Sequence, residues 1–243
     1  MSEGSIFDAG EDDLLDGLAE LSALALGGDA LVEQLQRLVE VCTSTISGIS
    51  VAGVTLMEDG KPDTVAVTDD KVLAVDRRQY GEGRGPCLDA IRLRQVVRAD
   101  NDGDSTPWPS FAEEARAVGC LSFLAAPILI GDDSVGSLNL YGLERDAFDR
   151  LDERPVALFA GQAGPIVAND RAVGRLRAVG EQLEQAMASR AVIEQAKGVV
   201  MAQHGVDADA AFAVLRQLSQ RRNEKLRAVA QRVIAGARPS ASR

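Results

Sequence analysis

Residues 120–143 read CLSFLAAPILIGDDSVGSLNLYGL, and the fold assignment depends on the strand pattern of this segment. Its two β-rich runs, 120–130 and 134–143, lie on either side of Gly131-Asp132-Asp133, a turn-forming sequence. This arrangement predicts a β-hairpin with two antiparallel strands. From residue 152 onward no strand pattern remains, so the whole sheet is expected before that point.

Working back toward the N-terminus, the chain shows a second hairpin and several helices. The β-rich runs 49–56 and 64–68 flank turn-forming residues and predict the second hairpin. The other expected elements are a helix over 29–46, a helix around 72–79, a helix over 86–94, a short strand at Val96-Val97 and a helix through Val118, capped by Ser110 with Glu113 as the reciprocal partner. Together these elements predict an α+β fold, an antiparallel sheet with flanking helices.

A long helix is predicted over residues 155–187. Leu176, Val179, Leu183 and Ala186 follow a spacing of three and four residues on this helix and form a heptad-like seam. Two interpretations of the seam stay open. It packs on the sheet of its own chain, or it pairs with the same helix of a second chain.

The tail of the chain predicts three short helices in a small bundle. The first ends near His204, and Gly205 suits the left-handed position that follows a helix. The second is expected to be capped by Asp207 and the third by Asn223. The inner stripes are Ala208, Ala211, Phe212, Leu215 and Leu218 on the second helix, and Leu226, Val229, Ala230, Val233 and Ile234 on the third.

Charge is divided unevenly along the chain. Residues 171–243 carry 13 Lys and Arg against 6 Asp and Glu, a net charge of +7, whereas residues 1–170 carry 13 against 31, a net charge of −18. A basic tail on an acidic body indicates a polyanion as the partner of the tail. Phe212 is the only aromatic residue of the tail and lies in the predicted inner stripe. No base-stacking platform is therefore expected, and recognition rests on Arg and Lys.

Two features of the first tail helix bear on such a partner. Arg190, Glu194 and Lys197 share one face, which is either a solvated face with an ion pair or a surface directed at phosphates. Gly198 lies inside the helix, where glycine costs about 1 kcal/mol relative to alanine. Close approach of another helix is the favoured reason for this glycine, ahead of close approach of a nucleic-acid backbone.

The sequence disfavours several classes of protein. Gly81, Gly83 and Gly85 do not form a dinucleotide fingerprint, and no phosphate-binding GxxxxGK[ST] motif is present. The single histidine, His204, cannot supply a Ser-His-Asp triad or a histidine-ligated metal to the N-terminal part. The 3 cysteines are widely spaced, which indicates buried structural residues rather than a disulfide framework. An acidic start and the lack of a spanning apolar segment predict a cytoplasmic protein with no membrane partner.

The tail resembles the ANTAR domain. The resemblance rests on SRAVIEQAKGVVM at 189–201, on Asp207-x-x-x-Ala211-Phe212-x-x-Leu215-Arg216 and on NEKLRAVAQRVI at 223–234. Residues 25–170 resemble a GAF domain of the kind that is fused to ANTAR domains in actinobacterial regulators. That resemblance rests on Gly85-Pro86-Cys87, the loop from Asp100 to Trp108, Ala126-Pro127-Ile128 and Gly136-Ser-Leu-Asn139-Leu-Tyr141.

The resemblance implies a transcription regulator and not an enzyme. The ANTAR domain is expected to bind an RNA stem-loop in the leader or terminator region of a nascent transcript and to prevent termination, with RNA polymerase involved only indirectly. The GAF domain is expected to be the sensor, with no known cofactor, no metal, and a small-molecule ligand left open. A homodimer is also expected. The residues expected to contact RNA are Arg190, Lys197, Gly198, Arg216, Arg222, Asn223 and Lys225.

The expected domain organisation follows from these assignments. It comprises an acidic leader at 1–24, the GAF-like sensor domain at 25–170, a connecting helix at 171–187, the ANTAR RNA-binding domain at 188–236 and a flexible tail at 237–243.

Two rival functions stay open. One is a DNA-binding regulator, because three short helices can also present a recognition helix to a DNA groove. The other is a thiol redox enzyme built on the GAF fold, because Cys87 and Cys120 lie in the same predicted domain.

Overall fold

The computed structural model describes residues 30–100, 106–149, 151 and 153–237. The predicted leader at 1–24 lies outside the described residues, as does the predicted tail at 237–243 apart from Ala237. The chain divides into two compact units, Met1–Arg171 and Ala172–Arg243.

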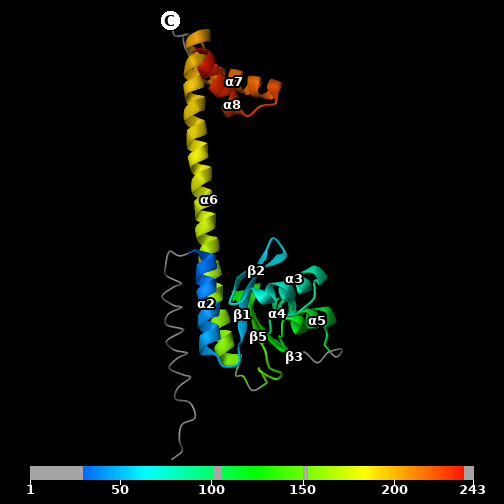
Figure 1. Cartoon of the computed structure of the whole chain (residues 1–243). Coiled ribbons are helices and arrows are strands. Elements are labelled where there is room, and N and C mark those ends of the chain that lie inside the picture. The colour runs from blue at the N-terminus through cyan, green and yellow to red at the C-terminus, as the bar shows by residue number, and fades with distance from the viewer. Residues whose placement is uncertain (1–29, 101–105, 150, 152, 238–243) are drawn as a thin grey trace, which may run out of the picture. The chain divides into compact units, whose positions relative to one another are not determined.

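The elements follow the predicted order (Figure 1). The first unit holds α2 (Leu31–Thr45), β1 (Val51–Glu58), β2 (Lys61–Val67), the 3-10 turn η1 (Asp70–Val72), α3 (Leu73–Glu82), α4 (Pro86–Leu93), β3 (Val97–Asp100), α5 (Pro109–Ala117), β4 (Ser122–Ile130) and β5 (Asp133–Gly142). Helix α6 (Glu153–His204) begins in the first unit and ends in the second, where α7 (Ala208–Arg222) and α8 (Leu226–Ala237) follow.

The five strands form one antiparallel sheet in the order β2-β1-β5-β4-β3, which confirms both predicted hairpins. Asp59 and Gly60, between β1 and β2, have φ angles of +50° and +78°. Positive φ at both central residues is what a two-residue hairpin turn requires, and an Asp-Gly pair supplies it readily.

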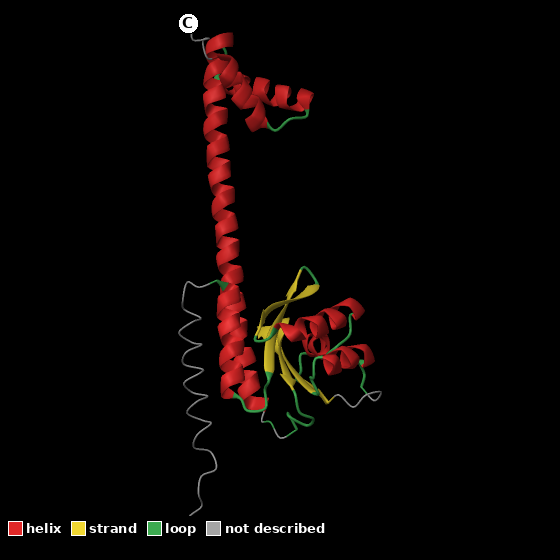
Figure 2. Ribbon diagram, viewed as in Figure 1, coloured by secondary structure: helices red, strands yellow, loops and turns green. Residues whose placement is uncertain are grey.

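Helices cover both faces of the sheet (Figure 2). On one face, Leu35 of α2, Leu138 of β5 and Phe159 of α6 belong to a single apolar cluster. On the other face, Phe111 of α5 and Tyr141 of β5 belong to a second cluster. Leu138 and Tyr141 are three residues apart on one strand and so point to opposite faces. The predicted α+β architecture is confirmed.

The predicted start of α5 is wrong. The N-cap of this helix is Trp108 and its first residue is Pro109, so Ser110 does not cap it with Glu113 as the partner. Proline suits the first helical position because its φ is fixed near the helical value and its missing N–H would have no partner there. This preference outweighs the capping ability of Ser110.

Helix α6 runs without a break from Glu153 to His204, so the helix predicted over 155–187 and the first helix of the tail are one element. The predicted seam is exposed, with fractional exposures of 75% at Leu176, 62% at Val179 and 61% at Leu183. The interpretation that these side chains pack on the chain's own sheet is therefore wrong. Within the described residues, no helix is long and apolar enough to cross a membrane.

In the second unit, the end of α6 packs with α7 and α8 around one apolar core, made of Ala196, Val200, Ala211, Leu215, Val229 and Ala230. Gly205 ends α6 with a φ of +63°, and its N–H donates to the carbonyl oxygen of Met201 at 2.9 Å. The carboxylate of Asp207 accepts from the N–H of Ala210 at 2.8 Å. These contacts confirm the predicted helix stop and the predicted cap of α7.

Candidate functional site

The predicted contact residues come from three parts of the second unit. Arg190, Lys197 and Gly198 lie on α6, Arg216 and Arg222 on α7, and Asn223 and Lys225 in the turn before α8. All are exposed except Lys197, which is half-buried. The bundle thus presents cationic side chains to solvent from each of these three parts.

Lys197 makes an ion pair on the surface of α6. Its Nζ lies 2.9 and 3.1 Å from the two carboxylate oxygens of Glu194, one helical turn away. The predicted ion pair on this face is confirmed. An ion pair with an exposed partner contributes only about 0.2–1 kcal/mol, so a phosphate can replace Glu194 as the partner of Lys197 at little cost.

Gly198 is not explained by packing within the chain. Within the described residues, a Cβ placed on Gly198 would meet no heavy atom within 4 Å outside its chain neighbours and the nearby backbone of its own helix. The favoured prediction, that another helix approaches this glycine closely, is therefore wrong for the helices that the structure describes. The surface over Gly198 is open to a partner.

Asn223 has a different structural role from the predicted one. It does not cap α8 but ends α7, with a φ of +50°, and its N–H donates to the carbonyl oxygen of Gln220 at 3.2 Å. Asparagine tolerates the left-handed conformation better than most residues, which suits it to this position. Helix α8 starts at Leu226, and the carbonyl oxygen of Lys225 accepts from the N–H of Ala228 at 2.9 Å.

Phe212 does not belong to the core of the bundle, contrary to the prediction. Its side chain is 38% exposed, while the adjacent Ala211 is fully buried. Neighbouring residues of a helix lie about 100° apart, and on α7 it is Ala211 that points into the core while Phe212 lies outside it. The second unit therefore carries an exposed aromatic ring.

In the first unit, buried polar side chains gather where α3 packs on the sheet. Asp76 of α3 is fully buried, and its carboxylate accepts hydrogen bonds from the hydroxyl of Tyr141, from Thr64 Oγ1 at 2.8 Å and from Gln79 Nε2 at 3.0 Å. The Oε1 atom of Gln79 accepts from the N–H of Cys87 at 3.2 Å. Asp76 thus links two strands and two helices.

The same network continues across β1 and β5. The Tyr80 hydroxyl lies 2.7 Å from both Thr64 Oγ1 and Thr55 Oγ1. Asn139 Nδ2 donates to Thr55 Oγ1 at 2.7 Å, and Ser137 Oγ donates to Asn139 Oδ1 at 2.8 Å. Thr55 and Ser137 are directly paired across the two strands, so both side chains point to the α3 face.

This network was not predicted from the sequence. The sequence patterns include Asn139 and Tyr141 only as parts of a motif and do not single out Asp76. The one local signal is the position of Asp76 on α3. It lies on the same helix face as Val75 and Gln79, and all three are buried. The partners of Asp76 at Thr64 and Tyr141 lie 12 and 65 positions away in the chain, and no local pattern connects them.

Burial sets the ionisation of these groups. Desolvation raises the pKa of the Asp76 carboxyl, although its three hydrogen bonds oppose that shift. Desolvation, with Asp76 as a further cause, raises the pKa of the Cys87 thiol and of the Tyr141 hydroxyl. Burial also raises the pKa of Cys42 to about 12 and of Cys120 to about 11. Thiolates are the reactive form of cysteine, so these buried thiols are poorly suited to redox catalysis.

A small hollow adjoins the network. Its lining is mainly apolar and is made by Gln79, Pro86, Cys87, Phe123, Leu124, Ala125, Asn139, Leu140 and Tyr141. The space between these side chains has room for about one water molecule. An organic ligand would need side chains of the network to move.

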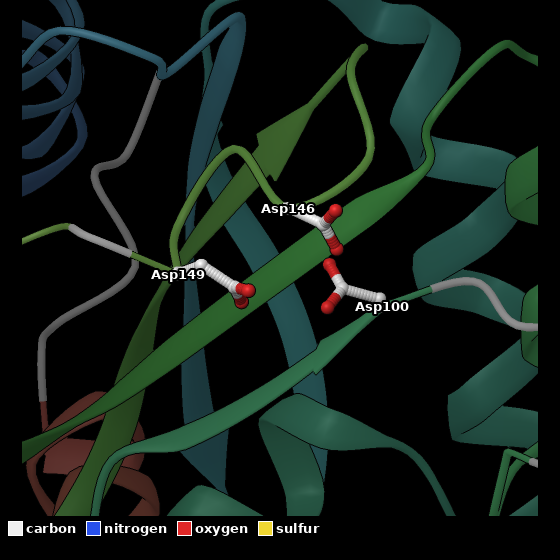
Figure 3. A group of neighbouring side chains, drawn as sticks. All are labelled: Asp100, Asp146 and Asp149. Atoms are coloured by element: carbon white, nitrogen blue, oxygen red, sulfur yellow. The ribbon is translucent and has the colours of Figure 1, made fainter.

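Asp100, Asp146 and Asp149 form a group of carboxylates at the edge of the first unit (Figure 3). One oxygen from each lies within 4.8 Å of the others. Asp100 is half-buried and the other two are exposed. Exposed acidic groups often gather without a metal, so this cluster is not assigned a ligand.

Comparison with known proteins gives two family matches. The model of the GAF domain matches residues 30–168, and the model of the ANTAR domain matches residues 181–234. No curated protein matches the chain. Both matched domains are regulatory in type.

Solved structures show the same fold for the first domain. Free methionine-R-sulfoxide reductase from Neisseria meningitidis, in complex with its substrate, is similar at 17% identity over 71% of this chain and 98% of that chain, with a TM-score of 0.54. The GAF domain of the Acinetobacter phosphoenolpyruvate-protein phosphotransferase is similar at 15% identity over 67% of this chain and 97% of that chain, with a TM-score of 0.51. The nlh2 GAF domain of A. aeolicus, in an inactive state, is similar at 11% identity over 65% of this chain and 98% of that chain, with a TM-score of 0.51.

At these identities the solved structures show a shared fold and carry no activity over to this chain. The family matches go further, because the GAF model alone covers more than half of the sequence. The protein therefore belongs to the GAF domain family and, with its ANTAR domain at residues 181–234, is a GAF–ANTAR regulator.

Proposed function

We propose that this regulator binds a stem-loop in nascent RNA through its ANTAR domain, prevents transcription termination, and is controlled by its GAF domain. The observation that carries the proposal is the ANTAR match over 181–234, a segment whose predicted contact residues are all exposed apart from the half-buried Lys197. Three features of the bundle surface suit it to bind RNA.

The first feature is positive charge. Arg190, Arg216, Arg222 and Lys225 are exposed on the bundle, and Lys197 is ion-paired with the exposed Glu194. Side chains of this kind neutralise phosphates and release counterions, so binding is expected to weaken steeply as salt rises.

The second feature is the open surface at Gly198. The absence of a Cβ lets a bulky backbone approach α6 more closely than any other residue would allow. Lys197 is the adjacent residue in the chain, so a phosphate that approaches Gly198 comes within reach of an ammonium group. This combination favours close contact with the RNA backbone.

The third feature is Phe212. Its exposed ring can stack on an unpaired base, which is how proteins commonly recognise the loops of RNA hairpins. The proposal therefore adds Phe212 to the Arg and Lys contacts that the sequence predicts. A hairpin loop offers splayed bases, whereas a DNA duplex keeps its bases stacked.

Control by the GAF domain is expected to act through the Asp76 network. The network is hydrogen-bonded around a hollow of about one water molecule, so ligand entry requires Tyr141, Gln79 or Asn139 to change partners. A small molecule that binds the opened form would shift an existing equilibrium between two states of the domain.

The test uses RNA recovered from the cells that make the protein. RNA crosslinked to the full chain is sequenced, and an enriched hairpin is then labelled and titrated with the wild type, with Lys197→Ala and with Lys61→Ala. Lys61 is an exposed lysine of β2 in the GAF domain, and its replacement controls for loss of one charge. We expect about tenfold weaker binding and a shallower salt dependence for Lys197→Ala only.

Two further measurements separate the outcomes. A DNA duplex of the same length should bind much more weakly than the hairpin, and tighter binding of the duplex would identify a DNA regulator. In transcription reactions across the cognate terminator, the wild type should raise read-through. Unchanged termination despite RNA binding would retain the RNA-binding proposal and reject antitermination.

A further inference from the structure

Arg98 of β3 holds the segment that leads into α6. Its Nη1 atom donates to the carbonyl oxygen of Asp149 at 3.3 Å, and its Nη2 atom donates to the carbonyl oxygen of Leu151 at 3.2 Å and to the carboxylate of Glu153 at 3.0 Å. Glu153 is the first residue of α6. A guanidinium carries its donors in a fixed fork, which suits it to hold several acceptors at once. One side chain of the sheet therefore fixes where α6 begins.

The strand that carries Arg98 also forms part of the wall around the small hollow of the GAF domain. Val97 packs against a buried cluster that includes Cys87 and Ala125, and both of these residues line the hollow. Neighbouring residues of a strand point to opposite faces, so Val97 lies on the side of the hollow and Arg98 on the side of α6. Strand β3 thus joins the wall of the hollow to the start of α6.

Strand β3 is better placed to move than the strand that holds the other end of this part of α6. It is 4 residues long, lies at the edge of the sheet and pairs with β4 alone. Farther along α6, Arg171 Nη2 donates to the carbonyl oxygen of Met57 in β1 at 3.2 Å, and β1 is paired on both sides. Fewer hydrogen bonds oppose a shift of an edge strand. A shift of the sheet is therefore expected to act on the start of α6 before it acts at Arg171.

The contacts of Arg98 can be released at little cost. Its Nε atom is buried and has no hydrogen-bond partner among the described residues, so the held position leaves one donor unsatisfied. The side chain of Glu153 is 49% exposed, and an ion pair with such a partner contributes little. The carboxylate of Asp149 belongs to the group with Asp100 and Asp146 (Figure 3). A guanidinium that leaves the two carbonyl oxygens therefore keeps acidic groups close by.

We propose that Arg98 is a positioning residue that couples the wall of the hollow to the start of α6. A ligand that enters the hollow displaces Cys87 and with it β3, and Arg98 then releases the first turn of α6. Helix α6 runs unbroken into the ANTAR core at Ala196 and Val200, so a change at its start acts on the helix to which the bundle is built. Helix shifts of about 1–2 Å are a common form of such regulation. This inference deepens the proposed control by the GAF domain and rests on it.

Hydrogen exchange in the full chain tests the hold of Arg98 without RNA. The measured peptide covers residues 153–163, at the start of α6. Arg98→Ala should speed its exchange about tenfold, the equivalent of about one net hydrogen bond. Arg37→Ala is the matched control, because Arg37 pairs with Glu40 on the surface of α2 and should leave this peptide unchanged.

A second substitution distinguishes coupling from a merely structural role of Arg98. Cys87→Val adds bulk against β3, while the backbone N–H at this position still donates to Gln79. We expect Cys87→Val alone to speed exchange of the peptide roughly threefold, and to add nothing when it is combined with Arg98→Ala. Cys87→Ala, which leaves a gap instead, makes the same comparison if Cys87→Val does not fold. An equal effect of the Cys87 substitution with and without Arg98, or no effect at all, would overturn the proposal.

Titration of the labelled hairpin separates this proposal from the proposed function. Cys87→Val should change the affinity for the hairpin about threefold in the wild-type background and leave it unchanged in the Arg98→Ala background. Coupled exchange with no change in hairpin affinity would support the role of Arg98 and reject control of RNA binding by the GAF domain. Uncoupled exchange would overturn the role of Arg98, whatever the hairpin affinity.

Discussion

The hydroxyl of Tyr141 donates a hydrogen bond to the carboxylate of Asp76, and both side chains are buried between the sheet and α3. This contact joins the last strand of the sheet to a helix that lies 65 residues earlier in the chain. Tyr141, Thr64 and Gln79 are all neutral donors, so the charge of Asp76 is stabilised by hydrogen bonds. The ionisation of Asp76 therefore affects the stability of the GAF domain.

Asp76→Asn should flatten the dependence of stability on pH. The folded pKa of Asp76 lies above its ordinary value of 3.8, so between those two values the native state binds more protons than the unfolded state. The free energy of unfolding then falls as pH rises through this window and stays reduced above it. Asparagine does not titrate, and its amide can donate to Thr64. The variant should thus be more stable than the wild type at neutral pH.

Urea unfolding followed by the fluorescence of Trp108 measures this effect, since Trp108 is the single tryptophan and lies in the GAF domain. Asp132→Asn is the matched control, because Asp132 is exposed in the turn between β4 and β5. An unchanged pH profile in Asp76→Asn would refute the assigned effect of burial.

Removal of the Tyr141 hydroxyl should cost more than removal of the Tyr80 hydroxyl. Tyr141→Phe takes a donor away from a buried carboxylate, which costs about 1–3 kcal/mol of unfolding free energy. Tyr80→Phe leaves only the neutral hydroxyls of Thr55 and Thr64, which keep Asn139 and Asp76 as partners. The expected loss of unfolding free energy for Tyr80→Phe is about 1 kcal/mol. The same urea titration measures the unfolding free energy of both variants. Equal losses would show that the hydrogen bond from Tyr141 does not stabilise Asp76 more than the hydroxyl of Tyr80 stabilises its neighbours.

The local elements of this fold were predictable because each depends on neighbours in the sequence. Turn residues between β-rich runs indicated both hairpins, and a glycine and an aspartate marked the junction of α6 and α7. The start of α5 was predicted wrongly because Pro109 and Ser110 both favour a helix start and only one can set it. The continuity of α6 was not predicted, because the heptad-like seam of its middle part and the bundle pattern of its last part were assigned to two separate helices.

The site was less predictable, because its chemistry depends on which face of each helix is covered. Ala211 and Phe212 are equally compatible with the three- and four-residue spacing of the α7 stripe. Packing on α6 selects the small alanine and leaves the phenylalanine exposed. The Asp76 network joins residues from five elements, and no local pattern encodes the pairing of β1 with β5 that brings them together.

Gly85→Ala should disrupt the network although Gly85 bears no side chain. A Cβ on Gly85 would overlap Oε1 and Cβ of Gln79, the residue that bridges Cys87 and Asp76. We expect a loss of about 1–3 kcal/mol in unfolding free energy. Gly81→Ala is the matched control, because a Cβ there meets nothing within 4 Å and alanine favours helix. Equal stability of the two variants, measured in urea, would contradict this role of Gly85.

Phe212→Ala should weaken RNA binding by a mechanism distinct from that of Lys197→Ala. Loss of a stacked base costs about 1–3 kcal/mol, a roughly 5- to 150-fold loss of affinity, and leaves the salt dependence unchanged. Lys197→Ala removes a phosphate contact and should reduce the salt dependence. Titration of the labelled hairpin at several salt concentrations separates them, and Phe212→Trp should retain binding. Wild-type affinity in Phe212→Ala would exclude stacking.

Gly198→Ala should stabilise the protein and weaken its binding to RNA. The added methyl group meets open space in the free protein, and alanine is favoured over glycine inside a helix by about 1 kcal/mol. In the complex, the same methyl group would hold the RNA backbone away from α6 and from Lys197. Stability and affinity are therefore expected to move in opposite directions.

Gly174→Ala provides the comparison that isolates the effect on RNA. Gly174 also lies inside α6, where a Cβ would meet nothing within 4 Å, but it precedes the ANTAR match at 181–234. Both variants should raise the melting temperature followed by circular dichroism at helical wavelengths. Only Gly198→Ala should lose affinity for the labelled hairpin. If both variants bind the hairpin as tightly as the wild type, the RNA backbone does not approach Gly198. The contact surface would then lie on α7 and the turn that follows it, where Arg216, Arg222 and Lys225 are exposed.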